Sequence, residues 1–170
     1  MSIFSVIHSL SLVLLALNSR KFSFSKIVLT KAHDRVTLLQ VFYLLTEDEK
    51  GIAFLKEVDM VQILAGILRK IVQPTKFQAS LTFGKNTFFP LIYPFQVEEQ
   101  LILSLLLKII HKDKTLVPHV IEECIDSLRE LLHLQKTHLK ELLENIVTVI
   151  AQNPEHGREA FLEINKVFIL

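Results

Sequence analysis

Two stretches of this chain repeat the same order of segments. Residues 37–68 read TLLQVFYLLTEDEKGIAFLKEVDMVQILAGIL, and residues 141–170 read ELLENIVTVIAQNPEHGREAFLEINKVFIL. Each passes from a leucine-rich segment through a polar break into a short segment ending in Phe-Leu. A small polar residue and another apolar segment follow. Repetition on this scale is typical of stacked helices, because one unit cannot bury its apolar face alone. The pattern therefore predicts an all-α chain.

Helical periodicity is clearest over residues 117–133 and 139–151, where apolar residues recur three and four positions apart. Pro118 fits the first turn of a helix, where its missing N–H costs nothing. Residues 101–110 (LILSLLLKII) are apolar nearly all round. A helix of this length is too short to span a bilayer. We therefore expect a central helix that neighbours cover on both sides.

The spacing of the polar breaks predicts an insertion. Breaks follow Leu45, Ile110 and Ala151, and the step from Ile110 to Ile150 is 40 residues. The step from Leu45 to Ile110 is 65 residues, which leaves a surplus of 25. This surplus falls on residues 73–97, which hold three of the five prolines and five of the twelve phenylalanines. Within this insertion, residues 80–91 are compatible with a small hairpin around Gly84-Lys85-Asn86.

With these segments in place, the chain resembles armadillo-like helical repeat proteins. The resemblance covers residues 35–72 and 96–170, with residues 1–34 as a degenerate first repeat or an N-terminal helix. It implies one domain over residues 1–170, folded as a right-handed helical superhelix of about three to four partial repeats. Such families present a groove to protein partners and rarely catalyse reactions.

The chain departs from that family in two respects. The asparagine with which peptide-binding members hold a partner's backbone is replaced at the corresponding positions, by Leu44, Ile109 and Val149. The glycine before the third helix is replaced by Asp59 and Asn165, which are good N-cap residues. We therefore expect the helix starts to be kept, without an asparagine ladder.

Charge and cysteine content exclude several classes of function. The net charge is +1, from 19 basic and 18 acidic residues, so no strong field attracts nucleic acid. The single cysteine, Cys124, excludes an internal disulfide framework and indicates a reducing compartment, so we expect a cytoplasmic protein. Cys124 lies in the apolar stripe of residues 117–133, which predicts a buried thiol and not a nucleophile.

No catalytic or metal-binding pattern stands out. His133 and His138 are five residues apart, which does not place both on one helix face as a zinc pair requires. His119 lies near Glu122, Glu123 and Cys124, but no second cluster completes a ligand set. The segment from Gly84 to Thr87 lacks the glycine and Lys-Ser/Thr pair of a phosphate loop. We expect neither enzymatic activity nor a cofactor.

The N-terminal segment has two main interpretations. Residues 1–17 (MSIFSVIHSLSLVLLAL) are apolar, but no basic residue precedes them, and their length is near the lower limit of about 17 for spanning a membrane. We expect a buried helix of the stack. A membrane anchor formed by residues 3–17 is the alternative, and a signal peptide cleaved near Ser19 also stays open. Both apolar ends of the chain suggest association with another subunit or membrane, or a longer parent chain.

These observations together predict a non-enzymatic scaffold that binds a protein partner. The expected groove is lined by the exposed sides of residues 98–112 and 138–152. Phe88, Phe89 and Tyr93 of the insertion are the expected contact residues, because exposed aromatic side chains on a proline-stiffened backbone make strong contacts. The alternative for the insertion is an Ω-like loop whose phenylalanines cover the helices.

Overall fold

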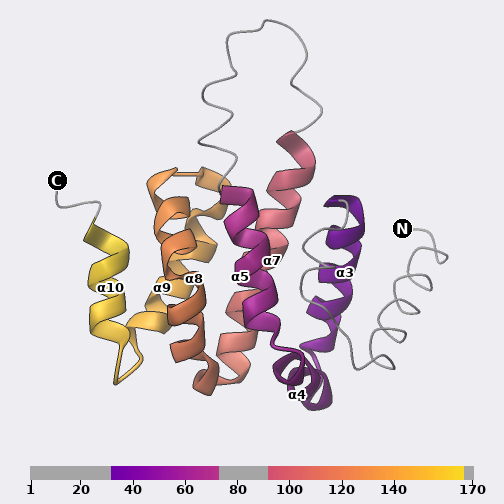
Figure 1. Cartoon of the computed structure of the whole chain (residues 1–170), viewed down its shortest axis with the longest axis horizontal. Coiled ribbons are helices and arrows are strands. Elements are labelled where there is room, and N and C mark those ends of the chain that lie inside the picture. The colour runs from indigo at the N-terminus through magenta and orange to yellow at the C-terminus, as the bar shows by residue number, and fades with distance from the viewer. Residues whose placement is uncertain (1–31, 73–91, 167–170) are drawn as a thin grey trace, which may run out of the picture.

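The computed structural model describes residues 32–72 and 92–166, which form helices joined by short turns, with no strand among them (Figure 1). This confirms the all-α prediction. The α helices of the described residues are α3 (Ala32–Leu45), α4 (Glu49–Glu57), α5 (Met60–Val72), α7 (Ile92–Lys112), α8 (Val117–His133), α9 (Lys140–Ala151) and α10 (Gly157–Asn165). Two short 3-10 helices, η1 (Lys114–Leu116) and η2 (Thr137–Leu139), precede α8 and α9.

Most helix bounds agree with the periodicity of the sequence. Helix α8 has the predicted bounds and carries Pro118 in its first turn. Helix α9 begins one residue later than expected, because Leu139 belongs to η2. Helix α7 contains the predicted central segment but is much longer than it.

The predicted insertion over residues 73–97 is too long at its carboxyl end. Helix α7 begins at Ile92, so residues 92–97 are helical. Pro94 does not prevent this, because the N–H groups of a first helical turn have no partner within the helix. Residues 73–91, including the expected hairpin, lie outside the described residues.

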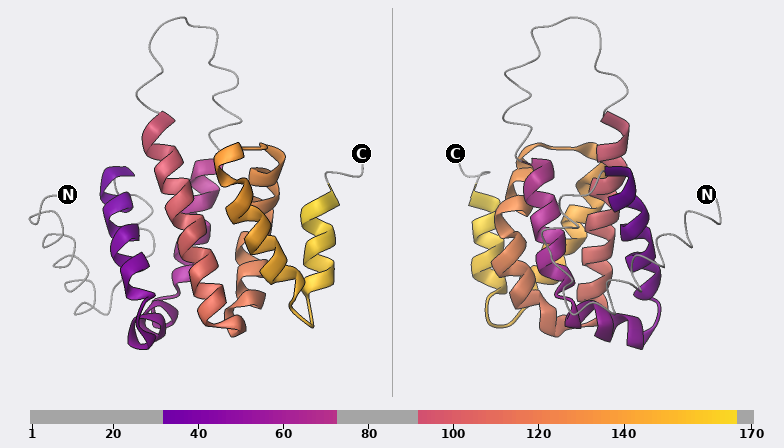
Figure 2. Two further views of the ribbon diagram at one scale, coloured as in Figure 1. Left: turned by 180° about the vertical axis from the view of Figure 1, so that it is seen from behind. Right: turned by 45° about the vertical axis from the view of Figure 1, so that its right-hand side comes forward.

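The helices form two rows. In one row α3 packs on α7 and α7 packs on α9, and these three lie side by side in the left view of Figure 2. In the other row α5 packs on α8 and α8 packs on α10 (Figure 1). Contacts of α5 with α7, and of α9 with α8 and α10, join the rows. The chain therefore alternates between two layers with the core between them.

Helix α7 occupies the centre of this core. Six of its apolar side chains are fully buried, namely Ile102, Leu103, Leu105, Leu106, Ile109 and Ile110. They face helices of both rows, since α7 packs on α3, α5 and α9. The expectation of a central helix covered by neighbours is confirmed.

Two glycines allow the short helices α4 and α10 to approach the ends of the helices before them. A Cβ on Gly51 would lie 1.9 Å from the carbonyl oxygen of Leu45. A Cβ on Gly157 would lie 2.6 Å from the carbonyl oxygens of both Ala151 and Ile150. Each glycine follows the last residue of the preceding helix by six positions. This shared close approach is a structural counterpart of the repeat in the sequence.

The two copies of the repeat nevertheless differ in packing. Helix α4 contacts α3 and α5 and lies below their lower ends in Figure 1, outside both rows. Helix α10, by contrast, belongs to the second row and packs on α8. The predicted N-cap at Asn165 is wrong, because Asn165 is the last residue of α10 and its amide donates to the carbonyl of Phe161. Asp59 does precede α5, and its Oδ1 accepts from the N–H of Gln62 at 3.4 Å.

Replacing Gly51 with alanine tests the close approach. Helix propensity alone favours alanine over glycine by about 1 kcal/mol. We expect Gly51→Ala instead to lower the free energy of unfolding by roughly 2 kcal/mol, because the new Cβ meets a backbone carbonyl that cannot rotate away. Urea denaturation followed by circular dichroism measures the change. Lys50→Ala, at an exposed position of α4, is the control and should shift stability by less than about 0.5 kcal/mol. A stabilised Gly51→Ala protein would contradict the described contact.

Candidate functional site

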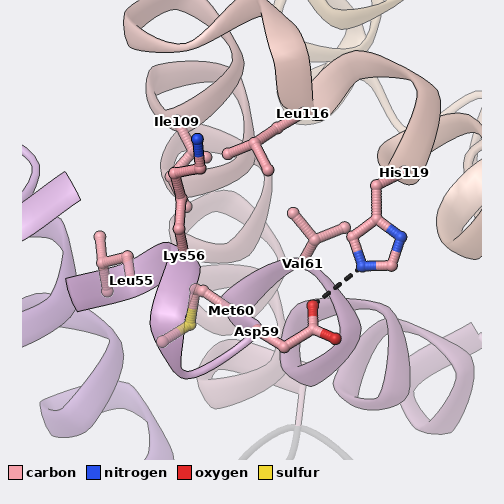
Figure 3. Close-up of a pocket in the computed structure, with 8 residues that line it drawn as sticks. All are labelled: Leu55, Lys56, Asp59, Met60, Val61, Ile109, Leu116 and His119. Carbon is pink, nitrogen blue, oxygen red and sulfur yellow. Dashed lines mark hydrogen bonds and ion pairs between the residues drawn. The ribbon is translucent and has the colours of Figure 1, made fainter. Parts of the chain in front are cut away.

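A pocket of about 250 Å³ opens where the α4–α5 turn meets the end of α7, η1 and the start of α8 (Figure 3). Its walls come from segments far apart in the chain. The lining residues are Leu55, Lys56, Asp59, Met60, Val61, Ile109, Leu116 and His119. The two rows of helices therefore meet around this hollow.

The floor of the pocket is apolar and belongs to the core. Leu55, Met60, Val61 and Ile109 are all buried apart from the face that they turn to the pocket. Leu55 of α4 and Met60 and Val61 of α5 flank a tight turn at Asp59, which has a φ of 52°. This left-handed conformation is uncommon outside glycine, although aspartate tolerates it better than most residues. The turn leaves only two residues, Val58 and Asp59, between the end of α4 and the start of α5.

A hydrogen bond between His119 and Asp59 lies on one side of the pocket. Nε2 of His119 lies 2.9 Å from Oδ1 of Asp59, and the dashed line in Figure 3 marks this contact. The other ring nitrogen, Nδ1, lies 3.9 Å from Oε2 of Glu122. Both members of the pair remain partly exposed to solvent. The contact ties the first turn of α8 to the α4–α5 turn.

An ion pair adjoins the pocket on the α7 side. Nζ of Lys56 lies 2.6 Å from Oδ2 of Asp113. The other oxygen of Asp113 accepts from the N–H of Thr115 at 3.0 Å and from its hydroxyl at 2.6 Å. The hydrogen bond from Lys56, followed by those from Thr115, lowers the pKa of Asp113 from 3.8 to about 2. This carboxylate is therefore ionised throughout the physiological range.

The polar groups around the pocket are engaged with one another. The hydroxyl of Thr115 donates to Asp113. Cys124 is buried in α8, and this burial raises the pKa of its thiol to about 12, which agrees with the buried thiol predicted from the sequence. Within residues 32–72 and 92–166, no three His, Cys, Asp or Glu side chains gather as metal ligands. The lining of the pocket is mainly apolar, with Lys56, Asp59 and His119 as its polar members.

Two buried carboxylates on α7 form a separate charged cluster. Glu98 accepts two hydrogen bonds from Arg35 of α3, at 2.5 and 3.1 Å. Glu99 forms an ion pair with Lys136, and its Oε2 lies 3.5 Å from Nε2 of His138. Each carboxylate thus has a cationic or imidazole neighbour from another part of the chain. The cluster joins α3, α7 and the α8–α9 connection.

The structure describes only part of the predicted contact site in the insertion. Phe88 and Phe89 lie outside the described residues, and for Tyr93 only the backbone, within α7, is described. Their predicted contact role stays a prediction. In the described part of the chain, no helix is long and apolar enough to cross a membrane, and residues 3–17 fall outside that part.

The expected groove between residues 98–112 and 138–152 is not where the pocket lies. Helices α7 and α9 do pack together, but the exposed residues of α9 are mostly polar. Leu44 is 67% exposed, whereas Ile109 and Val149 are 1% and 5% exposed. These three positions therefore form no row along a shared surface, and only Ile109 lines the pocket.

Sequence reasoning missed the pairing of Asp59 with His119. These residues are 60 positions apart, and the pattern marked Asp59 only as a helix start and His119 only as a weak metal candidate. The polar turn at Asp59 and the polar residues around η1 were visible signals of two loops. What the sequence lacked was the packing of α5 on α8, which brings the loops to the same end of the molecule.

Removing the charge of Lys56 tests the Lys56–Asp113 ion pair. We expect Lys56→Gln to raise the pKa of Asp113 toward 3.8, although the hydrogen bonds from Thr115 keep it below that value. A carboxylate with a lowered pKa stabilises the fold above its ordinary pKa and loses this contribution as pH falls through the lowered value. Lys56→Gln should therefore lose less stability than the parent between pH 3.8 and about 2.

Carbon-13 NMR titration of the Asp113 carboxyl measures the shift directly, and acid denaturation measures its effect on stability. Lys140→Gln is the matched control, because its partner Glu144 lies 3.8 Å away on the exposed face of α9. An unchanged Asp113 titration in Lys56→Gln would show that the described pair does not persist in solution.

Comparison with protein-family models, curated proteins and solved structures finds no match to this chain. The resemblance to armadillo-like repeats therefore stays a prediction from the sequence.

Proposed function

We propose that this protein is a non-enzymatic scaffold that binds a protein partner, and that the pocket beside Asp59 and His119 receives a bulky apolar side chain of that partner. The observation that carries the proposal is the apolar floor bounded by the Lys56–Asp113 ion pair and the His119–Asp59 hydrogen bond. Pockets that bind side chains commonly combine such a floor with a few polar groups that orient the ligand.

The energetics favour binding of an apolar side chain. Leu55, Met60, Val61, Ile109 and Leu116 surround the hollow with hydrocarbon. Burying a leucine or phenylalanine side chain there would contribute about 1.5–3 kcal/mol. The polar side chains beside the hollow would interact with the backbone or flanking residues of the partner. These contacts would orient the partner more than they would raise its affinity.

The pocket is also held in shape before any partner arrives. The Asp59–His119 and Lys56–Asp113 pairs connect the α4–α5 unit to η1 and α8. Several packed helices supply the floor. A preorganised site loses little conformational entropy on binding, so more of the contact energy appears as affinity.

The wider architecture supports a scaffold role. Two stacked rows of helices are the kind of framework that helical repeat proteins use to present a binding surface. We include in the proposal that the rows belong to a right-handed armadillo-like superhelix and that the protein acts in the cytoplasm, for which the single buried thiol of Cys124 is suitable.

Obstructing the pocket tests this proposal. Peptides selected from a displayed random library against the full chain should share a bulky apolar residue. We expect Leu116→Arg to weaken their binding at least tenfold, because the long charged side chain enters the hollow, and tenfold corresponds to about 1.4 kcal/mol. Leu116 is only partly buried, so the melting temperature of the Leu116→Arg protein should differ little from that of the parent protein.

Leu162→Arg is the matched control, since Leu162 is an exposed leucine of α10 that does not line the pocket. The affinity of the Leu162→Arg protein for the selected peptides should equal that of the parent protein. If Leu116→Arg binds the selected peptides as tightly as the parent does, the pocket is not their site.

The aromatic insertion needs a separate experiment. If Phe88, Phe89 and Tyr93 contact the partner, replacing all three with serine should reduce binding and leave the melting temperature nearly unchanged. Differential scanning fluorimetry and the same peptide-binding assay measure both effects. A large fall in melting temperature would instead favour the alternative in which these side chains cover the helices.

A further inference from the structure

The side of α3 that faces away from α7 is partly covered. Arg35 and Tyr43 mark the side toward α7, because Arg35 pairs with Glu98 and the Tyr43 ring lies 4.1 Å from Nζ of Lys108. At about 3.6 residues per turn, Thr37 and Val41 lie roughly opposite these residues. Yet Thr37 and Val41 are only 6% and 7% exposed. Something other than α7 therefore shields them.

Helix α4 does not account for the shielding of Thr37. It meets α3 at its carboxyl end, where Gly51 approaches the carbonyl of Leu45. Thr37 lies about two turns before that end. Leu44 shares the side of Thr37 and Val41 but is 67% exposed. The cover therefore extends over the first turns of α3 and stops before Leu44.

We propose that residues 3–17 of this chain pack as a helix on this side of α3 and extend the row formed by α3, α7 and α9. This inference is independent of the proposed pocket function. Residues 3–17 are predominantly apolar and precede α3 by a link of 14 residues. That link can reach about 46 Å when extended, which permits either direction of packing.

The lengths of the two segments are also compatible. Residues 3–17 would form a helix of about 22 Å, and the 14 residues of α3 span about 21 Å. Apolar side chains also continue around α3 beyond its α7 side, at Leu38, Val41 and Leu44. A helix with apolar residues on most sides is typical of a position between two neighbours and not at the edge of a stack.

Tryptophan fluorescence provides a direct test, because the full chain contains no tryptophan. In Leu10→Trp, we expect blue-shifted emission and acrylamide quenching several-fold weaker than in the same variant unfolded in urea. Emission and quenching in buffer that match the unfolded protein would overturn the proposal.

A second set of variants identifies the surface that residue 10 contacts. In the Leu10→Trp background, Val41→Lys places a charge on the shielded side of α3, so we expect a red shift and several-fold stronger quenching with the helical circular dichroism retained. Leu44→Lys is the matched control on the same side of α3 and should leave the tryptophan signal unchanged, because Leu44 is already exposed. If Val41→Lys unfolds the chain, Thr37→Lys repeats the comparison. If the tryptophan at position 10 stays buried in a folded Val41→Lys or Thr37→Lys protein, the proposed docking surface on α3 is wrong.

Three further outcomes would assign the cover to another occupant. Strong quenching of Leu10→Trp by vesicles of brominated phosphatidylcholine would indicate a membrane anchor. A blue shift that disappears on dilution would indicate a second copy of the chain. Burial of tryptophan in Val28→Trp but not in Leu10→Trp would assign the cover to the link that follows residue 17. Each of these results would overturn the proposal, and none depends on a ligand in the Asp59–His119 pocket.

Discussion

Burial of α7 is the constraint on which the rest of the described structure depends. This helix contacts both rows, and its central residues from Ile102 to Ile110 supply much of the shared core. Next to this apolar segment, the adjacent carboxylates of Glu98 and Glu99 interact with Arg35 on one side and with the α8–α9 connection on the other. A buried charge without a partner is strongly destabilising, so these contacts also determine which neighbours α7 accepts.

Much of the fold could be predicted from local patterns. The apolar stripe of α8 specified both of its ends, and the all-round apolar segment of α7 indicated a central helix. Local patterns failed where a residue type fits more than one position. Pro94 suggested a loop but is accommodated in a first helical turn, and Asn165 suggested a helix start but ends α10. The sequence order of segments also could not show that α4 and α10 occupy different places.

The candidate site was much less predictable than the helices. Its apolar floor could be identified only as core, because a core residue and a pocket residue such as Met60 share the same pattern. The hydrogen bond of His119 with Asp59 depends on the left-handed turn at Asp59 and on the packing of α5 against α8. Both are three-dimensional facts with no periodic signature. The burial of Cys124 was easier to predict, because its position in an apolar stripe of the sequence was sufficient.

The paired glycines have a consequence for which changes of length the chain can accept. Gly51 and Gly157 must each stand six residues after the end of a helix to face its last carbonyl groups. Inserting or deleting one residue in either turn would rotate the short helix by about 100° and bring a side chain into that contact. These two turns should therefore keep their lengths among homologous chains, even where the identities of their polar residues diverge.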